Sequence, residues 1–114
     1  MSNLITIELS DEDVDNILDA ALYSGISYWA SDLEKVKDSK EPRPIEYLSS
    51  ALTHGWALKL KDTEEEMTYK LTKQKFLKGI GQAVREGYAN LEDIDAPAAD
   101  CIVQCALFGK VMYS

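Results

Sequence analysis

WALKLKDTEEEMTYKLTKQKFLKGI, residues 56–80, is the stretch that decides the fold class. Large apolar side chains recur at every second position over 56–60 and again over 67–71, and an acidic segment separates the two runs. A period of two is typical of strands with one buried face, so the runs predict a β-hairpin. From Thr72 onward the apolar residues recur every three or four positions, which predicts a helix.

The predicted helix after this hairpin has a defined start and an unusual middle. Thr72 is placed as its N-cap, and Leu71 and Phe76 are placed for a hydrophobic staple. Gly79 and Gly81 lie in its interior, where glycine weakens a helix by about 1 kcal/mol relative to alanine. We therefore expect close contact with another backbone, or a bend, at these glycines.

Two further helices are predicted on either side of this central stretch. Ser10 and Asp13 form a capping box at the start of the first helix, and Gly25 is expected to end it in a left-handed conformation. Asp95 is the predicted N-cap of the last helix, which is expected to end at Gly109. The core-facing stripe of the first helix is predicted to be Val14, Ile17, Leu18, Ala21 and Leu22.

The remaining segments complete the expected sheet. Residues 4–9 and 26–30 are rich in β-branched or aromatic side chains and are predicted strands, and 111–113 can add a short one. The polar stretch 32–43 is predicted to end a strand and form an exposed loop. A short helix is expected from Pro44 up to Gly55.

Together these elements predict an α+β fold, with a small antiparallel sheet of three to four strands packed against about three main helices. The 114 residues are expected to form a single domain, 1–114. The last helix is apolar around its middle, which is more apolar surface than one small sheet can cover. We therefore expect a homodimer or a higher homo-oligomer.

The charge is strongly negative and unevenly distributed. The net charge is -8, and residues 1–50 carry 4 basic and 11 acidic groups, while residues 51–85 carry 7 basic and 4 acidic groups. This balance argues against non-specific nucleic-acid binding, which needs lysine and arginine. It is compatible with simple solubility, and also with an acidic surface that competes for the nucleic-acid channel of another protein.

Chemistry-bearing residues are few. Cys101 and Cys105 share one helix face, but His54 is the only histidine, so no zinc ligand set is predicted and the cysteines are expected to be reduced core thiols. The run Glu64-Glu65-Glu66 is expected to be a solvated turn. No catalytic motif is present, so we expect neither an enzyme nor a cofactor or metal. No signal peptide or membrane span is evident, which favours the cytoplasm.

Several residues are candidates for contact with a ligand or a partner. Tyr28 and Trp29 point to opposite sides of the predicted strand, so one of them can face a ligand or a second subunit, although core packing is the alternative. Gln104 interrupts an apolar helix and needs hydrogen-bond partners or an interface. The lysines of the hairpin can bind an anion, or simply protect a sheet edge. The candidates are Tyr28, Trp29, Trp56, Lys59, Lys61, Lys70 and Gln104.

Four segments, GISYW (25–29), GWAL (55–58), LTKQKFLKGI (71–80) and DAPAADCIVQCALFG (95–109), resemble a family of small bacteriophage and prophage proteins in the same order. The chain departs from that family in its longer polar stretch, 32–43. The family has no established activity, so the resemblance carries over no catalytic residue. It implies an accessory protein made in the cytoplasm of an infected bacterium, of a type that often blocks host defence, as anti-CRISPR proteins do.

Two functions follow as hypotheses. The first is a non-enzymatic phage-type inhibitor that binds a host defence protein through its acidic surface, in part as a nucleic-acid mimic, without binding nucleic acid or membrane itself. The alternative is an oligomeric sponge that sequesters a small nucleotide immune signal. Such a sponge would use stacking on Tyr28 or Trp56 together with the lysine cluster.

Overall fold

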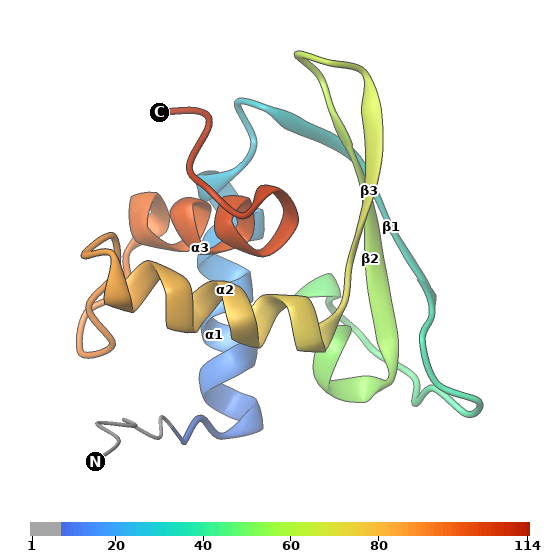
Figure 1. The fold of residues 1–114 in the computed structure, drawn as a ribbon. Helices are drawn as coiled ribbons and strands as arrows, with labels where there is room; N and C mark the ends of the chain where they lie inside the picture. The colour runs from blue at the N-terminus through green and yellow to red at the C-terminus, as the bar shows by residue number, and fades with distance from the viewer. Residues whose placement is uncertain (1–7) are drawn as a thin grey trace.

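A computed structural model describes residues 8–114, and within them a three-stranded antiparallel sheet packs beside three main helices (Figure 1). The order of the strands is β1-β2-β3, so each strand pairs with the next along the chain. The predicted α+β class is therefore confirmed. The strands are β1 (Ala30–Lys37), β2 (Trp56–Asp62) and β3 (Met67–Leu71), and the helices are α1 (Asp11–Ala20), α2 (Lys73–Arg85) and α3 (Ala96–Phe108).

The predicted hairpin and the helix that follows it are both confirmed. Leu58 of β2 pairs with Leu71 of β3, and both side chains are buried. The Thr72 hydroxyl accepts a hydrogen bond from the Lys75 amide and so caps α2, as the sequence predicts. Phe76 is fully buried, as a core-facing residue of this helix should be.

The prediction of a strand over residues 26–30 is wrong. Helix-like hydrogen bonds continue through this segment, because the amides of Trp29 and Ala30 both donate to the carbonyl of Ile26. Only Ala30 joins the sheet, and β1 extends through the polar residues that we expected to form a loop. As an edge strand, β1 needs few apolar side chains, and Glu34 instead forms an ion pair with Lys59 on β2 at 3.3 Å.

Gly25 does not have the left-handed conformation expected of it. The first helix continues from α1 into a π-helical turn, η1 (Ala21–Gly25), and Gly25 is buried in it. A Cβ atom at this position would lie 2.7 Å from the carbonyl oxygen of Ala96. Gly25 is therefore needed for close packing against the start of α3, not for chain reversal.

The other connections differ from expectation in smaller ways. Two 3₁₀ turns, η2 (Leu48–Ser50) and η3 (Leu52–His54), replace the single helix expected from Pro44, and they end at Gly55 with φ of 90°. Residues 111–113 join no strand. Most of the predicted first strand, 4–9, lies outside the described residues, and its last two residues are not in a strand.

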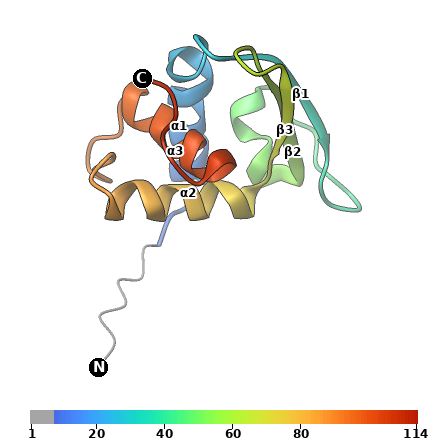
Figure 2. The same cartoon turned by 45° about the horizontal axis from the view of Figure 1, so that its top comes forward.

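One hydrophobic core joins all these elements, and α3 lies within it. Figure 2 shows α2 running along the underside of the molecule, beneath α3. Gly79 lets the two backbones approach, since a Cβ atom there would lie 2.5 Å from the carbonyl oxygen of Ile102. This chain alone buries most of α3, so the apolar character of the helix no longer argues for a second subunit. The homo-oligomer stays a prediction.

The two glycines of α2 should respond oppositely to the same substitution. Gly79→Ala should lower the free energy of unfolding by roughly 1–3 kcal/mol, because the added methyl group overlaps the α3 backbone. Gly81→Ala is the matched control and should raise it by about 0.5–1 kcal/mol, because only the flexible side chain of Arg85 lies nearby. Urea unfolding of both variants measures the difference, and equal effects would contradict this packing.

Candidate functional site

Asp100 of α3 is the centre of a buried polar network. Its Oδ1 accepts a 2.7 Å hydrogen bond from the indole Nε1 of Trp29 and a 2.9 Å bond from the Nε2 of Gln104. Its Oδ2 accepts a 2.5 Å bond from the hydroxyl of Tyr28. Asp100 and Gln104 lie one helical turn apart and so share a face of α3. The Asp100 carboxylate therefore links the turn that carries Tyr28 and Trp29, just before β1, to the last helix.

Gln104 binds the C-terminal segment through its side-chain amide. The Oε1 atom accepts hydrogen bonds from the backbone amides of Met112 at 2.7 Å and Tyr113 at 2.8 Å. The Nε2 atom donates to the carbonyl of Tyr113 at 3.0 Å. The side chain thus satisfies backbone groups that a neighbouring strand would otherwise satisfy, which is why residues 111–113 are ordered without joining the sheet.

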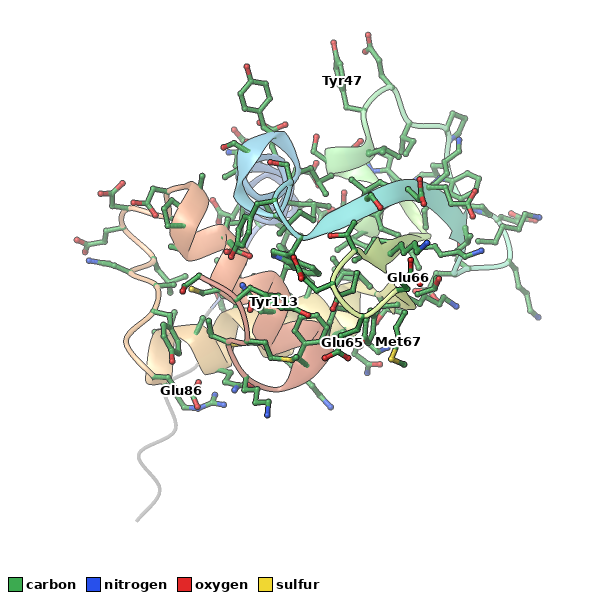
Figure 3. The ribbon with its side chains drawn as sticks, turned by 90° about the horizontal axis from the view of Figure 1, so that it is seen from above. Tyr47, Glu65, Glu66, Met67, Glu86 and Tyr113 are labelled. Carbon is green, nitrogen blue, oxygen red and sulfur yellow. The ribbon has the colours of Figure 1, made fainter. Side chains whose placement is uncertain are left out.

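Tyr113 extends this network to the hairpin. Its hydroxyl donates to Oδ2 of Asp62 at 2.7 Å, and Oδ1 of Asp62 accepts from the amide of Glu64 at 2.9 Å. Figure 3 shows Tyr113 beside the turn that carries Glu65. Asp62 is fully buried, so the tail and the hairpin turn are held together away from water.

The network places two of the predicted contact residues in the interior. Trp29 and Gln104 are both 0% exposed, so neither side chain reaches a partner at the surface. Tyr28 is different, because its hydroxyl bonds to Asp100 while 50% of the residue is exposed. Within residues 8–114, every buried side-chain nitrogen and oxygen atom has a hydrogen-bond partner. The network therefore stabilises the fold rather than presenting reactive groups.

Trp56 and the predicted lysines are largely occupied by contacts within the chain. The indole of Trp56 donates to the carbonyl of Arg43 at 2.7 Å, and the ammonium group of Lys35 lies 4.3 Å from its ring centroid. Lys70 lies 3.9 Å from Asp38, just as Lys59 pairs with Glu34. Lys61 is half-buried and lines a hollow with acidic neighbours. These lysines share one face of the hairpin, but the structure does not bring them together with Tyr28.

Two exposed tyrosines that the sequence analysis did not select form a different candidate surface. Tyr23 is 87% exposed and Tyr47 is 66% exposed, and both line one hollow of about 350 Å³ between η1 and η2. Asp19 and Glu46 lie beside them in the same hollow. Figure 3 shows Tyr47 pointing outward from the molecule. We call the hollow lined by these four residues the tyrosine hollow.

A sequence signal for one of these tyrosines existed. Tyr23 lies off the apolar stripe of the first helix, on a side that the pattern predicts to face water, and a large aromatic side chain is unusual there. Tyr47 falls in an irregular segment, where no periodicity distinguishes an exposed residue from a buried one. Only the folded structure, in which residues of η1 and η2 line the same hollow, shows that both tyrosines belong to one surface.

The remaining chemistry-bearing groups of the described chain form no reactive cluster. The Thr53 hydroxyl lies 2.7 Å from Oδ1 of Asp15 and 3.0 Å from Nδ1 of His54, and it joins η3 to α1. Both cysteines are free thiols, and burial raises the pKa of Cys105 from its ordinary 9.0 to about 11. In the part of the chain that the structure describes, no three histidine, cysteine, aspartate or glutamate residues are arranged to hold a metal ion.

Loss of the Gln104 amide should destabilise the protein strongly. Gln104→Leu keeps a side chain of similar size but leaves the amides of Met112 and Tyr113 without their acceptor. We expect the free energy of unfolding to fall by roughly 2–4 kcal/mol in urea titrations. Gln74→Leu makes the same change on the exposed face of α2 and should alter it by less than about 0.5 kcal/mol. An unchanged unfolding midpoint in Gln104→Leu would show that the hydrogen bonds from Gln104 to the backbone of Met112 and Tyr113 are not formed.

Alkaline pH should weaken the fold because four groups hold their protons more tightly when folded. Burial raises the pKa of Cys101 and of Cys105, burial and then the hydrogen bond to Asp100 raise that of Tyr28, and the hydrogen bond to Asp62 raises that of Tyr113. The native state therefore binds more protons than the unfolded state above about pH 9, and stability declines as pH rises.

Chemical unfolding between pH 8 and about pH 11 measures this decline. Tyr28→Phe removes one of the four groups, so its free energy of unfolding should fall less steeply with pH than that of the unaltered chain. A stability that stays constant to about pH 11, or an identical slope in the variant, would contradict the network.

Comparison with known proteins adds no assignment to this site. No family model matches the chain, and no curated protein or solved structure matches it. The similarity to small phage proteins therefore stays a prediction from the four segments that carry it. No helix among the described residues is both long enough and apolar enough to cross a membrane.

Proposed function

We propose that the protein is a non-enzymatic, phage-type accessory protein that inhibits a host defence protein by binding a basic surface on it. The binding surface is the acidic exterior around the tyrosine hollow. The negative charge lets it compete with nucleic acid for a channel lined by lysine and arginine. The phage origin in this proposal rests on the resemblance of the four sequence segments.

One observation carries the proposal: the two most exposed tyrosines of the described chain lie together and beside carboxylates. Tyr23 and Tyr47 expose most of their surface, although a tyrosine in a small domain usually packs its ring against neighbours. Tyrosine is enriched where proteins bind one another, because its ring buries a large area with little loss of conformational freedom. Solubility alone would explain the carboxylates but not the tyrosines.

The charge around the hollow is available for a partner. Three ion pairs form within residues 8–114, and they use the carboxylates of Asp11, Glu34 and Asp38. Asp19 and Glu46 are exposed and take part in none of these pairs. Exposed carboxylates elsewhere on the described chain include Glu12, Glu64, Glu65, Glu66, Glu92 and Asp93. A basic surface could neutralise this excess charge, whereas an acidic partner would be repelled.

The nucleotide sponge receives less support. A nucleotide needs a stacking surface and cations that lie close together. The hollow of about 470 Å³ beside Tyr28 is lined mainly by apolar atoms, and neither lysine nor arginine lines it. The lysines of the hairpin face acidic side chains instead. The aromatic and basic halves of such a site are therefore apart.

Binding should be sensitive to salt and to two carboxylates. The immobilised chain should retain a basic protein from a bacterial lysate at about 50 mM salt and release it at about 500 mM, because exposed charges are then screened. Duplex DNA should also release it. The variant Asp19→Asn/Glu46→Gln should retain much less of that protein.

A control with the same charge change tests whether position matters. Glu64→Gln/Glu65→Gln removes two carboxylates from the hairpin turn, away from the tyrosine hollow, and should retain the partner nearly as well as the unaltered chain. Retention that is indifferent to salt, or equal loss in both double variants, would contradict the proposal. Phage plating on defended bacteria that express each variant gives the functional readout.

A further inference from the structure

We infer that the tyrosine hollow binds the guanidinium group of an arginine side chain presented by the partner. This inference rests on the proposed function, because it names the chemical group that the acidic surface recognises. The hollow offers apolar, aromatic and anionic atoms in one place, and arginine is the side chain that uses all three.

The hollow is suited to a long side chain with a flat charged end. Leu22 and Leu48, which are half-buried, line the same hollow as the two exposed tyrosines and add apolar surface to it. The methylene groups of an arginine can cover such a surface while its charged end remains near water. The hollow has a volume of about 350 Å³, which is enough for one side chain.

The electrostatics favour a cation and, among cations, arginine. Asp19 and Glu46 can each accept two parallel hydrogen bonds from a guanidinium group, a geometry that lysine does not offer. The exposed faces of Tyr23 and Tyr47 can stack on the planar guanidinium by a cation–π contact. The chain already contains one contact of this kind, between Lys35 and the ring of Trp56.

The backbone that carries the two tyrosines is held in place before any partner arrives. The carbonyl of Tyr47 accepts hydrogen bonds from the amide of Ser50 at 3.1 Å and from its hydroxyl at 2.9 Å. The η1 turn that carries Tyr23 is closed by the bond from the amide of Ile26 to the carbonyl of Ala21, at 3.0 Å. A fixed backbone reduces the conformational entropy lost on binding, which leaves only the side chains of the two tyrosines to be ordered by a partner.

Arginine and lysine peptides of equal charge test this inference on the full chain. Fluorescently labelled hexa-arginine and hexa-lysine should both bind at low salt, with hexa-arginine binding about tenfold more tightly. Tyr23→Ala/Tyr47→Ala should weaken hexa-arginine about tenfold and hexa-lysine much less, because it removes the stacking surfaces but no charge. Fluorescence anisotropy measures each affinity, and circular dichroism confirms that the variants are folded.

A third exposed tyrosine provides the matched control. Tyr88 is 47% exposed and lies outside the hollow, so Tyr88→Ala should leave the preference for arginine unchanged. Equal affinities of the unaltered chain for the two peptides would overturn the inference and leave the proposed function standing. If neither hexa-arginine nor hexa-lysine binds at low salt, the proposed function itself is wrong. Light scattering of the unaltered chain gives a further test. If it shows an oligomer, and Tyr23→Ala/Tyr47→Ala dissociates that oligomer into monomers, a second copy of the chain occupies the hollow and the inference is wrong.

Discussion

Two side chains of α3, Asp100 and Gln104, position the parts of this chain that hydrophobic packing leaves undetermined. Asp100 receives the indole of Trp29 and the hydroxyl of Tyr28, while Gln104 binds the backbone of Met112 and Tyr113. Both are buried in a helix that is otherwise apolar. A buried polar group is costly unless its hydrogen bonds are made in one geometry, so these two residues select one arrangement of the turn before β1 and of the C-terminal segment.

The same helix depends on two close approaches that only glycine allows. Gly25 packs against the first residue of α3, and Gly79 packs against its middle. These contacts set the distance of η1 and α2 from α3, and the network then links α3 to the hairpin through Tyr113 and Asp62. The interior is therefore determined by short-range geometry around one helix, and the charged exterior contributes little to it.

The sequence predicts the local features of this fold well and the long-range ones poorly. The hairpin and the caps at Ser10 and Thr72 follow from a period or a capping residue, and each is present. The strand β1 could not be predicted because its pairing with β2 joins residues 19 to 32 positions apart, from Lys37 with Trp56 to Ala30 with Asp62, and is not decided by its own composition. Gln104 could be identified as a buried amide that needs partners, but its partner, the C-terminal backbone, appears only when the chain is folded. Tyr23 and Tyr47 form one surface only because η1 and η2 both pack on α1 and line the same hollow.

Within residues 8–114 the buried polar atoms of the side chains all have hydrogen-bond partners, whereas carboxylates and tyrosines at the surface are exposed to a partner. The Asp100–Gln104 network holds the turn that carries Tyr28 and Trp29, and the C-terminal segment, in place. Hydrogen exchange followed by nuclear magnetic resonance tests this role at the indole proton of Trp29 and at the amides of Met112 and Tyr113. If the network is formed, these three protons exchange as slowly as the core amides of α3. Exchange at the rate of an open loop would contradict this role.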